Sequence, residues 1–496
     1  MKHLLVTALA SLSLAAFGAW EKLASARLAD AEALMQGVTR AGELTGNQML
    51  GMMAAQMVGQ LPGADLMGPG RPGAAISYVL FVDGKALSKD PSEMLGALKY
   101  AVLYPVAQTK DAFLKDQEGA VETNGVVRVC ASDGDDEEDK KVTFVAFSTD
   151  GKWAAYGDDA QCVKAALADV KDAERKMKGD LVALQVAPHG LTLVQRMIDE
   201  AIKEAAKDEK LKDKVSPKQL ANVREVLASV TACYLGMRVG ERGIEVRSAT
   251  GVKKDSYLTR VGQKAISADS WKGADPAAIV FAAGAEDTGT EVISGDVVLS
   301  VLKKHGIDLP FLTIAKPMPN YEVVTVDVTG ASACQKTLTN AVEKVDAKQL
   351  EKDLMALMPS RDSLLEKNPE FGFALVVKDF KPVADPKTRF EKTLPEVKDK
   401  PVIARGFISV YSLLKSLVPV FLANVDANTR ASLEPVLKNL PPEGVCGTAY
   451  ASWREKNTWR TLLRVSADEL KGLSGCFAAF MAMSMQQSLN ASEDDE

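Results

Sequence analysis

Two stretches of the chain repeat the same order of apolar and polar residues. One begins LVALQVAPHGLTLVQRMI at Leu181, and the other begins PVIARGFISVYSLLKSLV at Pro401. Aligned without gaps, Leu193 falls on Leu413, 220 residues later. In both stretches a short apolar run predicts a strand, and apolar residues three and four apart predict the helix that follows it. The pattern therefore predicts an internal duplication.

The resemblance continues farther along both stretches. VTACYLGMRVGERGIEVRSA from Val230 resembles EGVCGTAYASWREKNTWRTLLRVSA from Glu443, with Cys233 opposite Cys446. Each segment reads as two strands joined by a tight turn. The predicted repeat is a strand, two helices and two strands. We expect the two cysteines to occupy matching strand positions as small buried residues.

Alternating and periodic segments fill the rest of the chain. In the first half we predict strands at 75–82, 99–106, 121–129, 141–148, 153–156, 181–186, 230–239 and 243–250. Helices are predicted at 108–115 and from a cap at Asp158 or Asp159 to about Met177. In the second half we predict strands at 277–283, 321–328 and 371–377, and helices at 292–304, 331–367, near Thr388 and at the end of the chain to about Leu489.

Strands that adjoin as hairpins, mixed with helices, predict an α+β fold with mostly antiparallel sheets. The Pro/Gly-rich segment LPGADLMGPGRPG marks a boundary near residue 72. We predict a signal peptide (1–26), an N-terminal helical segment (27–72), a first α+β domain (73–270), a related second domain (271–489) and an acidic tail (490–496).

The first residues are typical of a secretory signal. Lys2 and His3 precede an uncharged apolar run from Leu4 to Trp20, and small residues suit cleavage after position 18 or position 26. The alternative is an uncleaved anchor, but the run is short for a spanning helix. We expect an exported protein, periplasmic or at the outer surface, with no integral membrane span after cleavage.

Composition sets broad limits on function. Apolar residues make up 47% of the chain and charged residues 25%, which allows a sizeable core. The net charge of -6 argues against general nucleic-acid binding, which needs a basic face. The six cysteines show no CxxC and no zinc spacing. Cys130 and Cys162 flank one hairpin, so a disulfide between them is an alternative to free thiols.

Short motifs carry a family resemblance. They are Arg71-Pro72 before a strand, YPVAQTKDAFL at 104–114, WAAYGDDAQCVKAAL at 153–167 and FALVVKDFKPVADPKTRF at 373–390. With these motifs the chain resembles uncharacterised exported bacterial envelope proteins that carry a duplicated α+β domain of unknown function. The resemblance implies an envelope location and supplies no active-site residue.

One motif suggests serine chemistry. Ser412 and Lys415 match SxxK, in which a lysine one helical turn away activates the serine hydroxyl, and Ser300 with Lys303 is a second match. The KTG and SDN partner motifs are missing from the sequence. In the repeat, Thr192 stands opposite Ser412 and Gln195 opposite Lys415, which indicates a polar helix face. A serine hydrolase is therefore the remote alternative.

Histidine chemistry has little support. Beyond the signal, only His189 and His305 are present. His189 stands where a helix begins, opposite Ser409, a residue type that caps helices. His305 precedes Gly306 at a predicted helix end, where an imidazolium complements the helix dipole. We predict no catalytic residue, metal site or cofactor.

Two further features have an alternative ligand interpretation. The acidic run from Asp133 to Asp139 suggests calcium, but it lacks EF-hand spacing and fits a solvated hairpin tip. Methionines cluster at 49–57 and 481–485, a pattern that suggests Cu(I) or, more simply, core packing or an adaptable apolar groove. We predict a non-enzymatic binding or scaffolding protein with an unknown envelope partner. The alternative is a carrier of a lipid or peptide in a Met-lined groove.

Overall fold

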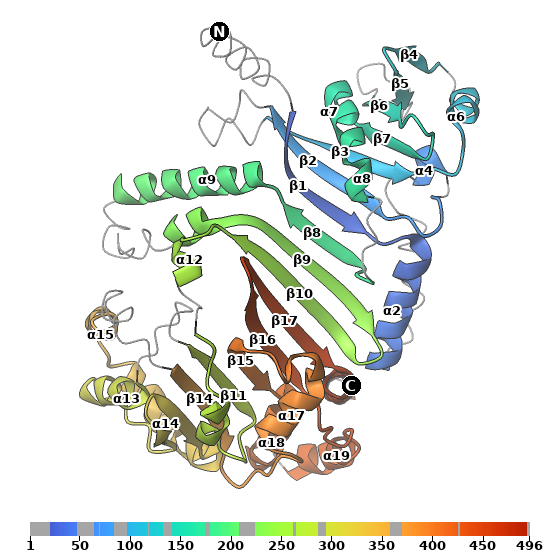
Figure 1. Ribbon diagram of the computed structural model, residues 1–496. Helices are drawn as coiled ribbons and strands as arrows, with labels where there is room; N and C mark the ends of the chain where they lie inside the picture. The colour runs from blue at the N-terminus through green and yellow to red at the C-terminus, as the bar shows by residue number, and fades with distance from the viewer. Residues whose placement is uncertain are drawn as a thin grey trace. The chain divides into compact units, whose positions relative to one another are not determined.

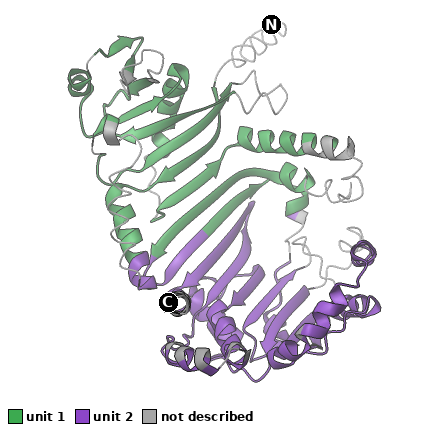
Figure 2. Ribbon diagram, turned by 180° about the vertical axis from the view of Figure 1, so that it is seen from behind, with its two compact units in different colours: residues 1–40, 48–239, 247–258 green, residues 41–47, 240–246, 259–496 purple. Residues whose placement is uncertain are grey.

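The chain divides into two compact units (Figure 2). Unit 1 comprises residues 1–40, 48–239 and 247–258, and unit 2 comprises 41–47, 240–246 and 259–496. The main change of unit thus falls at Leu258–Thr259, where the sequence predicts a boundary at 270. The computed structural model describes residues 20–46, 64–68, 70–83, 97–117, 119–131, 141–173, 179–207, 224–260, 264–285, 294–357, 370–424 and 427–493.

Unit 1 is built on an antiparallel sheet (Figure 1). Its central strands lie in the order β7 (Trp153–Gly157), β3 (Leu98–Pro105), β2 (Ile76–Asp83), β1 (Trp20–Leu28), β8 (Val182–Val186) and β9 (Val230–Gly240). Beyond β7 follow β6 (Lys141–Phe147), β5 (Val126–Ala131) and β4 (Val121–Thr123), and β10 (Gly243–Val252) pairs with β9.

Helices cover the two faces of this sheet at different places. On one face, α7 (Ala160–Ala166) packs on β3 and β7 through Cys162 and Val163, around the buried Trp153. Asp159 caps α7 by accepting from the backbone N–H groups of residues 161 and 162, as one of the two predicted caps. Two short elements continue it, η3 (Leu167–Asp169) and α8 (Val170–Ala173).

The described helices cover the opposite face only in part. At the β3–β7 side, Met67 of α4 (Ala64–Met67) and Phe113 of α6 (Lys110–Asp116) pack on Val102 and Tyr104. At one end of the strands, Leu193 of α9 (Pro188–Lys207) packs on Leu23 and Val82. Helices α2 (Ala31–Thr45) and α12 (Tyr257–Arg260) also begin in unit 1, and residues 224–229 are helical.

The strands of unit 2 are also mostly antiparallel. Its strands lie in the order β12 (Leu312–Met318), β13 (Tyr321–Val326), β14 (Glu370–Val377), β11 (Val280–Ala285), β15 (Val402–Ile408), β16 (Thr448–Glu455) and β17 (Thr458–Ser466). Among the described strand pairs of this unit, β13 and β14 alone are parallel, and α14 (Val328–Val342) and α15 (Ala347–Met355) lie between them in the chain.

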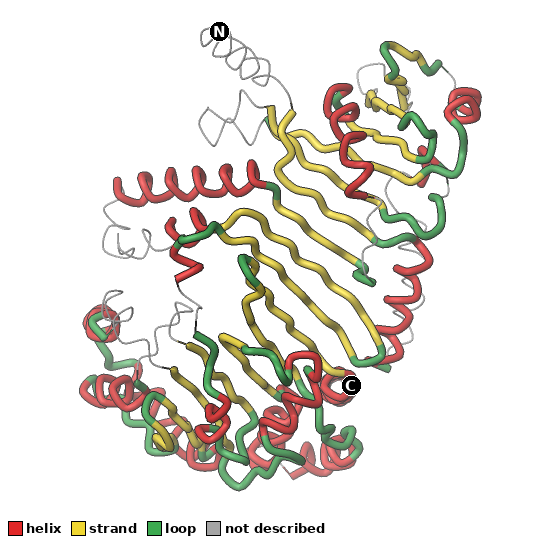
Figure 3. Tube along the Cα trace, in the orientation of Figure 1, coloured by secondary structure: helices red, strands yellow, loops and turns green. Residues whose placement is uncertain are grey.

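The core of unit 2 forms on one face of its sheet. Trp271 of η4 (Ala268–Gly273) and Phe390 of α17 (Pro386–Thr393) pack on Phe281 and Phe407. The remaining described helices of this unit are α13 (Gly295–Lys304), η6 (Pro395–Val397), α18 (Val410–Asn424), α19 (Ala427–Lys438) and α20 (Ala467–Glu493). Figure 3 shows helices and strands mixed along the chain, so the predicted α+β class with mostly antiparallel sheets is confirmed.

Five strands of each unit share one order. In unit 1 the order is β2, β1, β8, β9, β10, and in unit 2 it is β14, β11, β15, β16, β17, with a helix after β8 and after β15. The pairs β2–β1, β1–β8 and β8–β9 are antiparallel, and so are the four pairs of unit 2. The shared order agrees with the predicted duplication, which stays a prediction.

Strand register changes the predicted alignment of the copies. Val186 of β8 opposes Cys233 of β9, whereas Gly406, which lies 220 residues after Val186, opposes Tyr450 of β16. Cys446 precedes β16 and lies in no strand. The predicted match of the two cysteines is therefore wrong, because cross-strand pairing and not residue identity sets which positions correspond.

The N-terminal segment also differs from the prediction. The sequence predicts a signal to residue 26 and helices from residue 27, but Trp20–Leu28 is strand β1, paired on both sides with β2 and β8. Cleavage after Ala26 would remove most of this strand, whereas cleavage after Gly18 leaves it whole. Helix α2 is present as predicted, and the methionines at 49–57 lie outside the described residues.

Two strands were mispredicted for local reasons. The run at 121–129 forms a hairpin of β4 and β5, because Asn124 and Gly125 both take positive φ angles, as a two-residue hairpin turn requires. Strand β12 was not predicted, because it contains Pro317, which is unusual inside a sheet. It is an edge strand that pairs only with β13 among the described strands. Within the described residues, no helix is long and apolar enough to cross a membrane.

Candidate functional site

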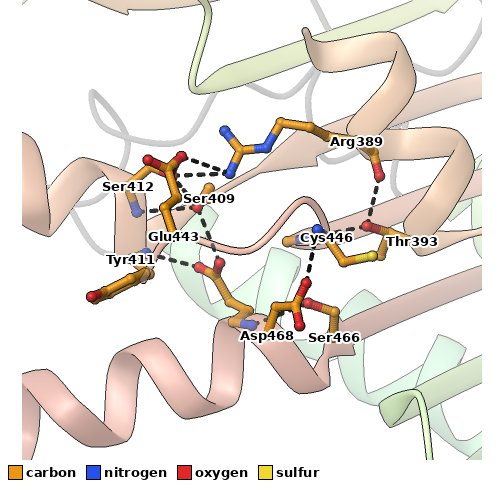
Figure 4. A network of polar contacts seen from close by, with 11 residues as sticks. Arg389, Thr393, Ser409, Tyr411, Ser412, Glu443, Cys446, Ser466 and Asp468 are labelled. Atoms are coloured by element: carbon orange, nitrogen blue, oxygen red, sulfur yellow. Dashed lines mark hydrogen bonds and ion pairs between the residues drawn. The ribbon is translucent and has the colours of Figure 1, made fainter. Parts of the chain in front are cut away.

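The predicted serine site lies inside unit 2, in a network of polar side chains (Figure 4). Ser412 is on the first turn of α18 and its side chain is fully buried. Its Oγ donates to Glu443 Oε1 at 2.5 Å, accepts from Arg389 Nη2 at 3.0 Å and lies 2.6 Å from Ser409 Oγ. The hydroxyl hydrogen is therefore directed at a carboxylate.

A second carboxylate, that of Glu469, accepts hydrogen bonds at the start of α18. Glu469, on the first turn of α20, accepts from the Tyr411 backbone N–H at 2.9 Å and from Ser409 Oγ at 3.1 Å. Ser409 Oγ accepts in turn from the Ser412 backbone N–H at 3.1 Å. These contacts satisfy amide groups at the start of α18 that have no partner within the helix. Ser409 is thus a helix cap, as its residue type predicted.

Buried charge shapes the electrostatics of this network. Burial raises the pKa of Glu469 and lowers the pKa of Arg389. Arg389 is fully buried, pairs with Glu443 at 3.1 Å and stacks over the Phe407 ring at 5.0 Å. Its Nε and Nη1 have no hydrogen-bond partner among the described residues. An arginine so enclosed needs Glu443, because an unpaired charge in the interior is costly.

This geometry does not support a serine nucleophile. SxxK chemistry needs a lysine within hydrogen-bond reach of the serine and a serine that a substrate can reach. Ser412 is fully buried, and its polar contacts among the described residues are with Arg389, Ser409 and Glu443 rather than Lys415, whose Nζ lies 5.8 Å from the Tyr411 ring centre. The arrangement fixes the start of α18 and its junction with α20.

The second SxxK match is also structural. Ser300 Oγ donates to the Asp296 carbonyl oxygen at 2.8 Å, one turn back in α13. Lys303 pairs with Asp308 at 3.3 Å on the exposed end of the same helix. Neither contact joins the serine to the lysine, so this pair is an ordinary surface of a helix.

The two histidines stand at helix ends, as predicted. His189 is the second residue of α9 and lies 3.2 Å from Glu21, at an exposed position. His305 ends α13, and its Nε2 lies 3.1 Å from Asp353 of α15. Lys304 and Gln349 also hydrogen-bond to Asp353, and these bonds lower the pKa of that carboxyl to about 2. The cluster ties α15 to α13.

Among the described residues, the cysteines and acidic side chains considered as ligands do not converge on one site. Cys162 is a free, buried thiol, so no disulfide joins it to Cys130. Cys233, Cys334, Cys446 and Cys476 are free as well. The acidic run at 133–139 lies outside the described residues. Across the described ranges, no group of three His, Cys, Asp or Glu side chains is placed to hold a metal ion.

The feature that sequence reasoning missed is one face of the unit 1 sheet. The paired registers of β1, β8 and β9 place nine residues on this face, which we call the open face. None of them is charged: Ala24, Ala26, Leu28, Val182, Leu184, Val186, Cys233, Leu235 and Met237. Leu184, Leu235 and Met237 are 41%, 45% and 38% exposed, and the others are half-buried.

The opposite face of the same strands is polar and more deeply buried. Ser25 and Arg27 of β1 are only 5% and 8% exposed. In the next strands their neighbours include Gln185 and Tyr234. Tyr234 donates to Asp180, which also pairs with Arg247 at 2.7 Å. A sheet with one solvated face normally buries its apolar side and exposes its polar side. In these three strands that arrangement is inverted.

The open face has clear borders. Leu193 of α9 packs on Leu23 and Val82 at one end, and the helices α4 and α6 cover the β3–β7 side. The alternating pattern of each strand was visible in the sequence, but which side faces solvent was not.

Comparison with protein-family models, with curated proteins and with solved structures gives no match.

Proposed function

We propose that this is a non-enzymatic binding protein that holds an apolar ligand on the open face of unit 1. The observation that carries the proposal is the exposure of Leu184, Leu235 and Met237 on one face of β8 and β9, while Ser25 and Arg27 are buried on the opposite face of β1. An exposed contiguous apolar patch is typical of a binding surface.

Size and charge support a small apolar ligand. Three strands, each contributing about five residues, span roughly 200 Å². A stable protein interface takes about 800 Å² from each partner. The nine positions of the open face include no acidic or basic residue that could recognise a charged partner. The ligand that fits is therefore an uncharged hydrocarbon, such as the acyl chain of a lipid.

This proposal refines the function that the sequence predicts. The predicted Met-lined groove relied on methionine clusters, whereas the methionine on the open face is Met237. An exported, periplasmic or outer-surface location is part of the proposal, because the signal pattern supports it. The second candidate is a scaffold whose envelope partner covers the open face together with a wider surface around it. The exposure of Val194 and Met197 on α9 favours this second candidate.

The experiment compares charged variants of exposed apolar residues. Leu184→Lys with Leu235→Lys places two charges on the open face, and Val342→Lys with Met355→Lys places two on exposed helix positions of unit 2. Each protein is titrated with a fluorescent fatty-acid analogue. We expect the first variant to bind about ten-fold more weakly and the second to bind like the parent.

The proposal fails if the parent does not bind the analogue or if both variants bind it equally. Mass spectrometry of apolar molecules extracted from the natively purified protein separates the two candidates. A co-purifying lipid supports the carrier, and a co-purifying protein whose binding Leu184→Lys abolishes supports the scaffold.

A further inference from the structure

Two helices of unit 2 lie side by side and run in the same direction. Tyr411 on the first turn of α18 is bonded to Glu469 on the first turn of α20. Gly472 presses against the Tyr411 ring, where any side chain would collide with it. One turn farther along each helix, Lys415 is close enough to act on the pKa of Cys476. The contacts advance together along both helices, so the helices are parallel.

Among the described side chains of this pair, five large apolar ones are exposed, and we call them the paired-helix patch. Phe477 and Phe480 of α20 are 66% and 61% exposed. Met481 follows on α20, and Leu414 and Leu417 lie on α18, each about 40% exposed. With 3.6 residues per turn, Phe477 and Phe480 lie on one flank of α20 relative to Gly472, and Leu414 and Leu417 lie on the matching flank of α18 relative to Tyr411. The two flanks face the same side.

The helices that carry the patch have almost no charge. From Gly472 to Ser492, α20 contains no acidic or basic residue. Lys415 is the sole charged residue of α18 by sequence. A charged partner would find nothing to pair with on the patch. Exposing phenylalanine side chains to water to this extent is unfavourable. Transferring them to an apolar environment would lower the free energy.

We propose that the paired-helix patch docks on the surface of a lipid bilayer. The five side chains present on the order of 400 Å² of apolar surface. A stable protein interface takes about 800 Å² from each partner, so a second copy of the chain would have to cover surface beyond the patch as well. A bilayer sets no such minimum, because apolar residues of an interfacial helix insert individually at the boundary between headgroups and acyl chains.

The inference goes beyond the binding function proposed for unit 1 and uses different residues. The test is cosedimentation of the exported protein with vesicles of phosphatidylethanolamine and phosphatidylglycerol. We expect the parent to bind them and Phe477→Ser with Phe480→Ser to bind about ten-fold more weakly. Val121→Ser with Val342→Ser removes two exposed apolar residues elsewhere, 59% and 53% exposed, and is expected to bind like the parent. Binding that depends on an uncharged patch should persist in high salt.

A second measurement reports insertion directly. The variant Phe480→Trp is expected to shift its emission to shorter wavelength when vesicles are added, whereas Val342→Trp is not. The proposal is overturned if the double serine variant binds vesicles as well as the parent, or if Phe480→Trp gives no shift. It is also overturned if the phenylalanines instead govern self-association, seen as a change in oligomeric state without vesicles.

Discussion

At the scale of single residues, buried polar groups in unit 2 act on structure rather than chemistry. Arg389, Glu443 and Glu469 surround Ser409 and Ser412 and supply partners for the first amides of α18. A sequence motif for serine chemistry thus coincides with a helix cap. The hydroxyl is the same in both cases, and its enclosure decides which role it can take.

The clearest consequence concerns Arg389. Replacing it with Met in Arg389→Met keeps most of the volume but leaves Glu443 buried without its cation. Removing one partner of a buried pair costs about 3–5 kcal/mol of the free energy of unfolding. Urea unfolding of unit 2 should show this loss. The control Arg430→Met, at an exposed site on α19, should change it by less than about 1 kcal/mol. A similarly small effect at Arg389 would contradict the assignment.

The contacts of Asp353 predict that the packing of α15 on α13 is sensitive to acid. Hydrogen bonds, first from Lys304 and then from His305 and Gln349, lower its pKa from 3.8 to about 2. A carboxyl with a lowered folded-state pKa adds stability above its unfolded value, and this stability is lost as pH falls from about 4 toward about 2. In Asp353→Asn that part of the acid dependence should be missing from unfolding curves measured at stepped pH. Asp308→Asn is the control for an exposed ion pair. The same pH dependence in parent and Asp353→Asn would disprove the prediction.

At the scale of elements, strand β1 organises unit 1. It lies between β2 and β8, so both of its edges carry paired backbone groups. The sequence suggests a signal followed by a helical segment here, because the strand follows directly on an apolar leader. The alternation of buried Leu23, Ser25 and Arg27 with less buried residues is a strand pattern, but Ser and Arg on the buried side conceal it.

A proline substitution tests this central position. Ala26→Pro removes a backbone donor opposite Tyr78 and Leu184, where central strands do not tolerate proline. We expect unit 1 to lose its cooperative unfolding transition, measured by circular dichroism and tryptophan fluorescence. Val121→Pro, at the first residue of the short edge strand β4, should leave the transition near its parent midpoint. Equal effects of the two prolines would contradict a central place for β1.

At the scale of the whole molecule, each unit exposes an apolar surface, on sheet strands in unit 1 and on helices in unit 2. In unit 1 this surface is the open face, and in unit 2 it is the paired-helix patch. On these two surfaces we propose the binding of an apolar ligand and the docking on a lipid bilayer. Each part of this proposal rests on its own residues and is tested by its own variants.

Processing of the N-terminus is a prediction for the whole chain. Because β1 spans Trp20–Leu28, the sheet of unit 1 is complete only if these residues remain after the proposed removal of a signal peptide. We expect the exported chain to begin at Ala19 after cleavage following Gly18. Mass spectrometry of the intact exported protein measures this directly. A chain that begins at Arg27 and still folds would show that β1 is dispensable.

The sequence alone determined the class of fold and most of its elements, because alternation and helical periodicity are local properties of the chain. The β7 and β14 strands, the Asp159 cap and the helix-end places of the two histidines followed from residue type and spacing. The order of five strands common to both units also agrees with the predicted repeat. The predicted alignment of the two repeats was wrong at Cys446, because matching residue types does not reveal which residues pair across neighbouring strands.

Only the tertiary structure decided which side of each strand meets solvent and which charges become buried. A strand presents one set of residues to each face, and its sequence does not say which face the helices will cover. Ser412 reads as polar in the sequence but is enclosed by Arg389 and Glu443, which approach from distant segments. Leu184 and Leu235 read as core but are exposed. Burial depends on long-range packing, and for this protein packing determines where function is proposed.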